Sequence, residues 1–129
     1  MAIPRAAGRE GTGAGSRSTT WRWTALSGVV LLVLVTVHMV ANHFVVEQVG
    51  GLRTYRQVLE YIGNPVIFVI ESAFLVVVTA HAMLGLRSVL LDFGLSPATK
   101  RLLDRGLVAL GAITVAYGFV LIGVLASRA

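Results

Sequence analysis

The sequence predicts an all-α fold of three transmembrane helices, at about residues 22–47, 65–92 and 103–127. Of its 129 residues 56% are hydrophobic, and most of these lie in three blocks almost free of charge. The blocks are residues 25–46, 65–86 and 106–127, each 22 residues long, and Glu71 is the single Asp, Glu, Lys or Arg within them. A helix of that length is about 33 Å long at ~1.5 Å per residue, enough to cross a ~30 Å hydrocarbon core.

The first block is interpreted as a retained span, because the apolar region of a signal peptide has only roughly 7–15 residues. Trp21 and Trp23 stand at its entrance, where such rings settle at the headgroup level. Residues 1–20 are rich in Gly, Ala, Ser, Thr and Arg and are predicted to form a disordered cytoplasmic tail. Residues 21–129 are then one three-helix membrane anchor domain.

Glycine and proline residues mark the connections between the predicted helices. Residues 52–62 are expected to form a short interfacial helix, and Pro65 to occupy the first turn of the second span. Gly94 and Pro97 are expected to end that span, and the third helix to begin between Lys100 and Arg105. Small residues on the third helix favour close approach of another helix: Gly111, Ala112, Ala116, Gly118 and Gly123. Three helices bury little of their own polar interior, so we expect a multi-subunit helix bundle.

Charge and composition restrict the function. The net charge is +5, but the basic residues form no single patch, which argues against nucleic-acid binding. Eight of the eleven precede the first span or join the second to the third, so the positive-inside rule places the N-terminus in the cytoplasm and the C-terminus outside. Cysteine is absent, which excludes disulfides and thiolate ligation of metals. The chain is too short to hold a catalytic domain beside three spans.

His81 lies at membrane depth, where an ionisable side chain faces a cavity, a partner or a cofactor far more often than lipid. At 100° per residue, Gly85, Ser88 and Asp92 share its face, and Phe74 continues the stripe in the other direction. A glycine one turn after a histidine leaves a flat slot beside the imidazole, which suits a porphyrin next to its axial ligand. The alternative is a core histidine bonded to a neighbouring helix.

His38 occupies a similar place on the first helix. It shares a face with Ser27, Leu31, Leu34 and Asn42, whereas His43 is expected at the interface. At ~1.5 Å per residue, His38 lies about 4 Å to the outer side of the midplane and His81 about 8 Å to the cytoplasmic side. Two ligands that differ by roughly 12 Å in depth do not share an upright haem. Each would need a histidine from another chain, giving two haems at two heights.

Glu71 is expected about 7 Å to the outer side of the midplane on the same rise. Two interpretations remain open for it: a proton carrier, or a group hydrogen-bonded to a partner helix or a buried arginine.

The chain resembles one known family. Residues 81–94, HAMLGLRSVLLDFG, resemble the second-helix signature of succinate dehydrogenase (succinate:quinone oxidoreductase) membrane anchors. Residues 115–120, VAYGFV, are similar to the third helix of the smaller, D-type anchor, and residues 22–28, RWTALSG, to the start of its first helix.

The resemblance implies a complex with a flavoprotein, an iron–sulfur subunit and a second membrane anchor, in the plasma (inner) membrane of a bacterium. The chain would perform no succinate chemistry; it would dock the other subunits and help form a site for menaquinone or ubiquinone. His81 matches the haem b ligand of the family, and His38 lies at the level of a second haem. The remaining candidate cofactor contacts are Arg22 and Arg87 for haem propionates, and Ser27, Ser88 and Asp92 at or near the quinone.

Departures keep alternatives open. Many D-type anchors have a quinone-contacting tyrosine where this chain has Phe93, which cannot donate that bond, and single-haem members lack a first-helix ligand. The rivals are a fumarate reductase anchor, a haem-free scaffold subunit whose histidines bond between helices, and a transporter component that uses Glu71 and His38 for protons.

Overall fold

The computed structural model describes residues 14–44 and 53–129, with side chains from residue 19 onward. Four helices form these segments: α1 (Ala14–Phe44), α2 (Tyr55–Gly63), α3 (Pro65–Leu91) and α4 (Pro97–Ala126). Three of them are long and apolar enough to cross a membrane, over Thr19–Phe44, Pro65–Leu91 and Pro97–Ala126. The predicted all-α fold with three spans is confirmed.

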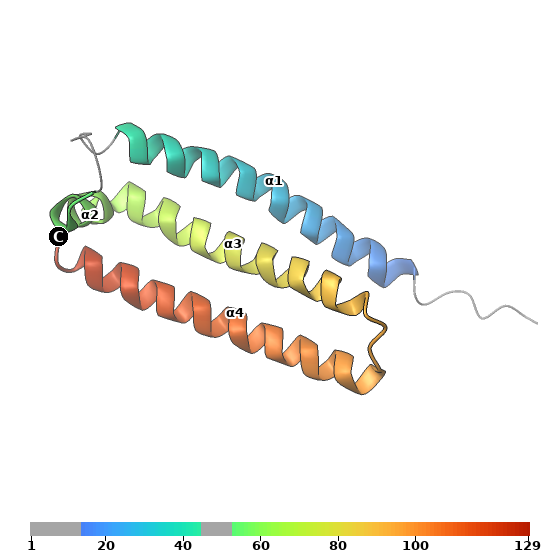
Figure 1. Cartoon of the computed structure of the whole chain (residues 1–129). Helices are drawn as coiled ribbons and strands as arrows, with labels where there is room; N and C mark the ends of the chain where they lie inside the picture. Colours follow the sequence, from blue (N-terminus) through green and yellow to red (C-terminus); the bar gives the residue numbers. More distant parts are fainter. Residues whose placement is uncertain (1–13, 45–52) are drawn as a thin grey trace, which may run out of the picture.

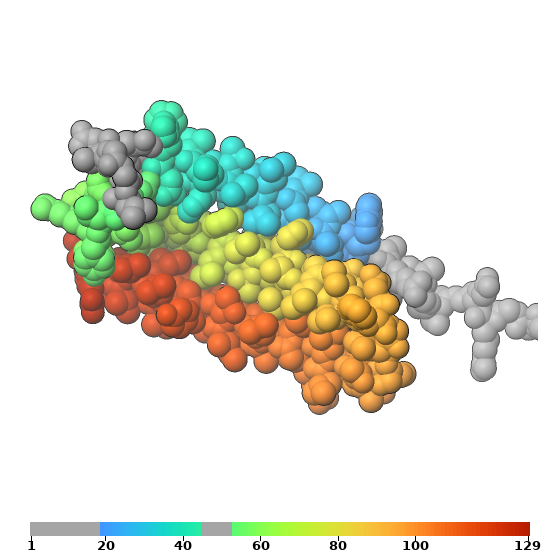
Figure 2. Space-filling model, viewed as in Figure 1, coloured from blue at the N-terminus to red at the C-terminus, as the bar shows by residue number. Residues whose placement is uncertain are grey.

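The three long helices lie side by side, with α3 between α1 and α4 (Figure 1). The short helix α2 lies at the end of the molecule where α1 and α4 finish and α3 begins, and the C-terminus lies beside it. Figure 2 shows the same order in space-filling form, with α3 in the middle of the face that is in view. The central helix therefore carries the contacts that hold the domain together.

Two helix starts differ from the prediction. Helix α1 begins at Ala14, so residues 14–20, which were expected in the tail, are helical. The rest of that tail, residues 1–13, and the expected end of the first helix at 45–47 lie outside the described residues.

Helix α4 begins at Pro97, about six residues before the predicted start. The Ser96 side chain accepts the backbone N–H of Thr99 as an N-cap, and Pro97 follows at a position where its missing N–H costs nothing. The proline expected only to break one helix thus begins the next. Gly94, at φ +68°, makes the turn between them.

Local hydrogen bonds also fix both ends of α2. Thr54 and Gln57 form a capping box at its start. Asn64 separates it from α3 and caps α3 by accepting the N–H of Val66, and Pro65 occupies the first turn as predicted. The short helix expected at 52–62 is therefore present, at Tyr55–Gly63, and its place at the membrane interface stays a prediction.

Few apolar side chains in the described residues are buried. Tyr61, Ile62 and Ile67 form a cluster where α2 meets α3, while large side chains along the spans stay open, such as Leu32 and Ile113, each 67% exposed. Exposed apolar side chains on a spanning helix are covered by lipid or by partner helices. Packing inside this chain therefore concentrates at the α2 end.

Gly118 gives a test of the packing between α3 and α4. A Cβ built at Gly118 would overlap the side chain of Leu75, whereas one at Gly106, on the same helix, has no neighbour within 4 Å. We expect Gly118→Ala to destabilise the protein by about 1–3 kcal/mol through overpacking. Gly106→Ala is expected to be neutral or slightly stabilising, because alanine is the better helix former. Thermal unfolding in detergent, followed by circular dichroism, compares them; equal melting temperatures would contradict this contact.

Candidate functional site: two polar bridges between α1 and α3

The faces of α1 and α3 that carry the predicted histidines meet each other. Ser27 on α1 lies against His81 on α3, and His38 on α1 lies against Glu71 on α3. The two helices run antiparallel, so both bridges fit one register. The helix faces of His38 and His81, which were identified from the sequence, thus pack against each other within one chain.

The first bridge joins the Ser27 hydroxyl to Nδ1 of His81, at 3.0 Å. The same hydroxyl donates to the backbone carbonyl of Thr24 at 2.9 Å. A serine has one hydroxyl hydrogen; when Thr24 accepts that hydrogen, Ser27 accepts from His81 and Nδ1 of His81 carries the proton. Nε2 of His81 then holds a lone pair, and no described residue hydrogen-bonds to it.

Glycines make room on two sides of His81. A Cβ at Gly28 would stand 3.3 Å from Cε1 of His81, so a larger residue there would require the ring to shift by a few tenths of an ångström. At Gly85, one turn after His81, a Cβ would meet nothing within 4 Å. The space at Gly85 is therefore open among the described residues.

The second bridge joins the imidazole of His38 to the carboxylate of Glu71. Nδ1 of His38 lies 2.7 Å and 2.9 Å from the two carboxylate oxygens of Glu71, whose side chain is 11% exposed. Tyr61 of α2 donates its hydroxyl to the same carboxylate at 2.5 Å. A carboxylate that accepts from both neighbours fixes the proton on Nδ1 of His38, as Ser27 does for His81.

Asn42 links this bridge to α2. Its amide nitrogen donates to the Tyr61 hydroxyl and to the backbone carbonyl of His38, each at 2.8 Å. These bonds use both amide hydrogens, so the 3.4 Å contacts from this nitrogen to the His38 ring are secondary. The Arg53 guanidinium donates to the backbone carbonyl of Asn42 and lies over the Tyr61 ring, 5.2 Å from its centroid.

Burial raises the pKa of Tyr61 above its ordinary value, and the hydrogen bond to Glu71 raises it further. The phenol therefore stays protonated throughout the neutral range and remains a hydrogen-bond donor to the carboxylate.

The two histidines stand at different heights. Glu71, which is level with His38, precedes His81 by ten residues on the same helix. At ~1.5 Å per residue this is about 15 Å along the axis, close to the separation expected from the sequence. Within the described residues no three His, Cys, Asp or Glu side chains gather to hold a bare metal ion. Each site instead offers a single imidazole, and Nε2 of His81 has no hydrogen-bond partner among the described residues.

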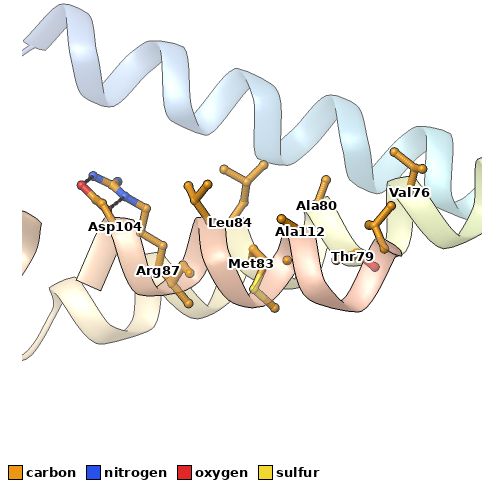
Figure 3. A pocket seen from close by; sticks show the side chains of 12 residues that line it. Val76, Thr79, Ala80, Met83, Leu84, Arg87, Asp104 and Ala112 are labelled. Carbon is orange, nitrogen blue, oxygen red and sulfur yellow. Dashed lines mark hydrogen bonds and ion pairs between the residues drawn. The ribbon is translucent and has the colours of Figure 1, made fainter. Parts of the chain in front are cut away.

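Arg87 has a partner that was not predicted. Its guanidinium pairs with the Asp104 carboxylate at 2.6 Å and joins α3 to α4 (Figure 3). The pair lies at one end of a hollow of about 510 Å³ between these helices, lined by Thr79, Met83 and Gly111 among others. This arginine faces α4, so it reaches a haem at the α1–α3 face only by leaving Asp104.

The other candidate contacts remain open to a partner. Arg22, Ser88 and Asp92 are exposed, and Asp92 caps the end of α3. Asp92 follows His81 by eleven residues, about 16 Å along the axis, so it does not cluster with Ser27, which is level with His81. Phe93 is 75% exposed.

Sequence reasoning missed Gly28, Tyr61 and Asp104 as contacts and left the partner of Glu71 open. One signal was available: His38 and Glu71 were placed at similar heights, and Asn42 was on the His38 face. Nothing local marks Tyr61, because its partners are distant in sequence.

Fold and site together define a multi-pass membrane subunit with histidines held at two depths. A family model described as succinate dehydrogenase/fumarate reductase transmembrane subunit matches residues 7–121, and the chain belongs to that family. The resemblance seen in residues 81–94 is thereby confirmed.

A relative agrees with this assignment. The chain is 32% identical over 72 residues to the succinate dehydrogenase hydrophobic membrane anchor subunit of Archaeoglobus fulgidus. The alignment covers 56% of this chain and 59% of that protein.

Tyr61 provides a test of the second bridge. Tyr61→Phe removes the hydroxyl that donates to Glu71 and accepts from Asn42, leaving both less satisfied, so we expect a loss of about 1–3 kcal/mol of stability. Tyr55→Phe, on the same helix and 58% exposed, is the control and should change stability by less than about 0.5 kcal/mol. Thermal melting in detergent measures both; equal effects would count against the bridge.

Proposed function

We propose that this chain is the membrane anchor of a succinate dehydrogenase complex. It docks a flavoprotein and an iron–sulfur subunit together with a second anchor, ligates haem b and forms part of a quinone site. The family and the three spans support the anchor role. The succinate chemistry belongs to the other subunits, so this chain acts on electrons and on the quinone alone.

One observation carries the haem assignment: Nδ1 of each intramembrane histidine lies within hydrogen-bond distance of an oxygen on the facing helix, so a proton on Nδ1 leaves Nε2 as the ligating nitrogen. Metal-ligating histidines are usually oriented in this way, with the second nitrogen donating to an oxygen. His81 is the ligand of one haem and His38 of a second, each paired with a histidine of another chain. Bound haem supplies one-electron redox chemistry between the other subunits and quinone.

Positive charge gives the orientation. Arg22, Arg87, Lys100, Arg101 and Arg105 lie at the end of the molecule where α1 begins and α3 turns into α4. The positive-inside rule places this end in the cytoplasm. The haem of His81 is then nearer the docked subunits, and the haem of His38, at the α2 end, is farther from them.

Exposed polar groups at the cytoplasmic end serve the quinone. Ser88 and Asp92 are open to a partner chain, and a titratable group such as Asp92 supplies a proton when quinone is reduced. Ser27 is already bonded to Thr24 and His81, so a quinone oxygen has to compete for its one hydrogen. Arg22 is available to a propionate, and Arg87 becomes available on release from Asp104.

The rival with a specific observation in its favour is a haem-free scaffold, because hydrogen bonds between α1 and α3 are what it requires. It gives no reason for the open space at Gly85, or for an Nε2 of His81 that has no hydrogen-bond partner among the described residues. A fumarate reductase anchor would have the same architecture, and the direction of catalysis depends on the potentials of the quinone and the haems.

His81→Ala tests the haem assignment. We expect the purified complex to lose one haem per copy of this subunit, measured as pyridine haemochrome, and to assemble less well. His43→Ala is the control: this histidine is exposed at the end of α1, and its removal should leave haem content unchanged. Full haem content in His81→Ala would refute the ligand.

His38→Ala tests the second haem. We expect loss of one spectroscopically distinct haem while the His81 haem stays, seen in reduced-minus-oxidised spectra of the complex. A parent complex with one haem for each copy of this subunit would refute the two-haem arrangement.

A further inference from the structure

The two candidate haem ligands differ in what holds them. Nδ1 of His81 faces a neutral hydroxyl, that of Ser27. The acceptor for Nδ1 of His38 is the carboxylate of Glu71, with both of its oxygens within 2.9 Å of the ring nitrogen. A negative charge therefore stands directly beside one imidazole and not beside the other.

The Glu71 side chain is held in position by its neighbours. Tyr61 donates to it from α2, and Asn42 in turn donates to Tyr61. The ring of Phe74, one turn after Glu71 on α3, stacks on His38 with centroids 5.1 Å apart and planes 24° apart. Groups from three helices thus fix both the carboxylate and the plane of the imidazole, in a region with only 11% exposure of the Glu71 side chain.

We propose that Glu71 is the positioning residue of the His38 haem ligand and lowers the reduction potential of that haem. This inference rests on the proposed ligation by His38. The carboxylate holds His38 in the tautomer that presents Nε2, and its hydrogen bond makes the imidazole a stronger electron donor. A nearby negative charge in a weakly screened site also disfavours the addition of an electron to the iron. Both effects stabilise the ferric state.

Glu71→Gln separates charge from shape. The glutamine carbonyl still accepts from Nδ1 of His38, so the haem stays bound, but the negative charge is gone. We expect the midpoint potential of the haem assigned to His38 to rise by at least ~59 mV. For a one-electron couple this corresponds to a tenfold change in the ratio of oxidised to reduced haem at a fixed potential. The other haem should keep its potential. A redox titration of the whole complex, followed at the α-bands, measures both.

Ser72→Ala is the matched control. This serine is the next residue of α3, and its buried hydroxyl has no hydrogen-bond partner among the described residues. Both potentials should stay at the wild-type values in this variant. Unchanged potentials in Glu71→Gln, or an equal shift in Ser72→Ala, would overturn the proposal.

A second variant tests the same role of Glu71 if the complex with Glu71→Gln does not assemble. Glu71→Asp keeps the charge but withdraws it by one methylene, so a smaller upward shift is expected; no shift would again overturn the role of Glu71. His38→Ala distinguishes the two levels of the argument. If it loses no haem, ligation by His38 is wrong; if it loses one and the Glu71 variants leave the potentials unchanged, only the present inference fails.

Discussion

The structure depends on the pairing of polar side chains between two antiparallel helices in an apolar surrounding. Ser27 with His81 and His38 with Glu71 each satisfy groups that would be costly to leave unpaired in hydrocarbon. The two bridges lie about three turns, or roughly 15 Å, apart along the helix axis. Two contacts at that separation fix the register of α1 against α3. A slip of one turn would break both bridges together. The register in turn decides which nitrogen of each histidine is free.

The bridges also explain why α2 belongs to the domain. This nine-residue helix is too short to be stable alone in water, and its ends are held by the Thr54 capping box and by Asn64. Its buried Tyr61 reaches Glu71, which is level with His38. The connection between the first two spans thus supplies a hydrogen-bond donor to the second bridge, and α2 is part of the site.

The sequence predicts the elements well and their partners poorly. Charge-free length locates the three spans, and helical periodicity puts His38 with Asn42 and His81 with Gly85 on the faces that are used. Depth along the helix anticipates the separation of the two histidines. Partners depend on rotation and register of helices joined by loops, which no local pattern records, so the bond from Tyr61 to Glu71 and that from Arg87 to Asp104 could not be read from spacing. The start of α4 was missed because Pro97 was taken as a breaker alone, although Ser96 before it is a typical N-cap.

The same energetics require neighbours for this chain. Three helices in one layer leave most of their large apolar side chains exposed, and the described part of the chain buries little beyond Leu107 and a small cluster at the α2 end. Lipid can cover such side chains, but it cannot satisfy a free imidazole nitrogen. Each bridge uses one nitrogen of its histidine and leaves the other oriented away from its partner on the facing helix. Nε2 of His81, which no described residue hydrogen-bonds, is therefore the strongest reason within the described part of the chain to expect a neighbouring group at this layer.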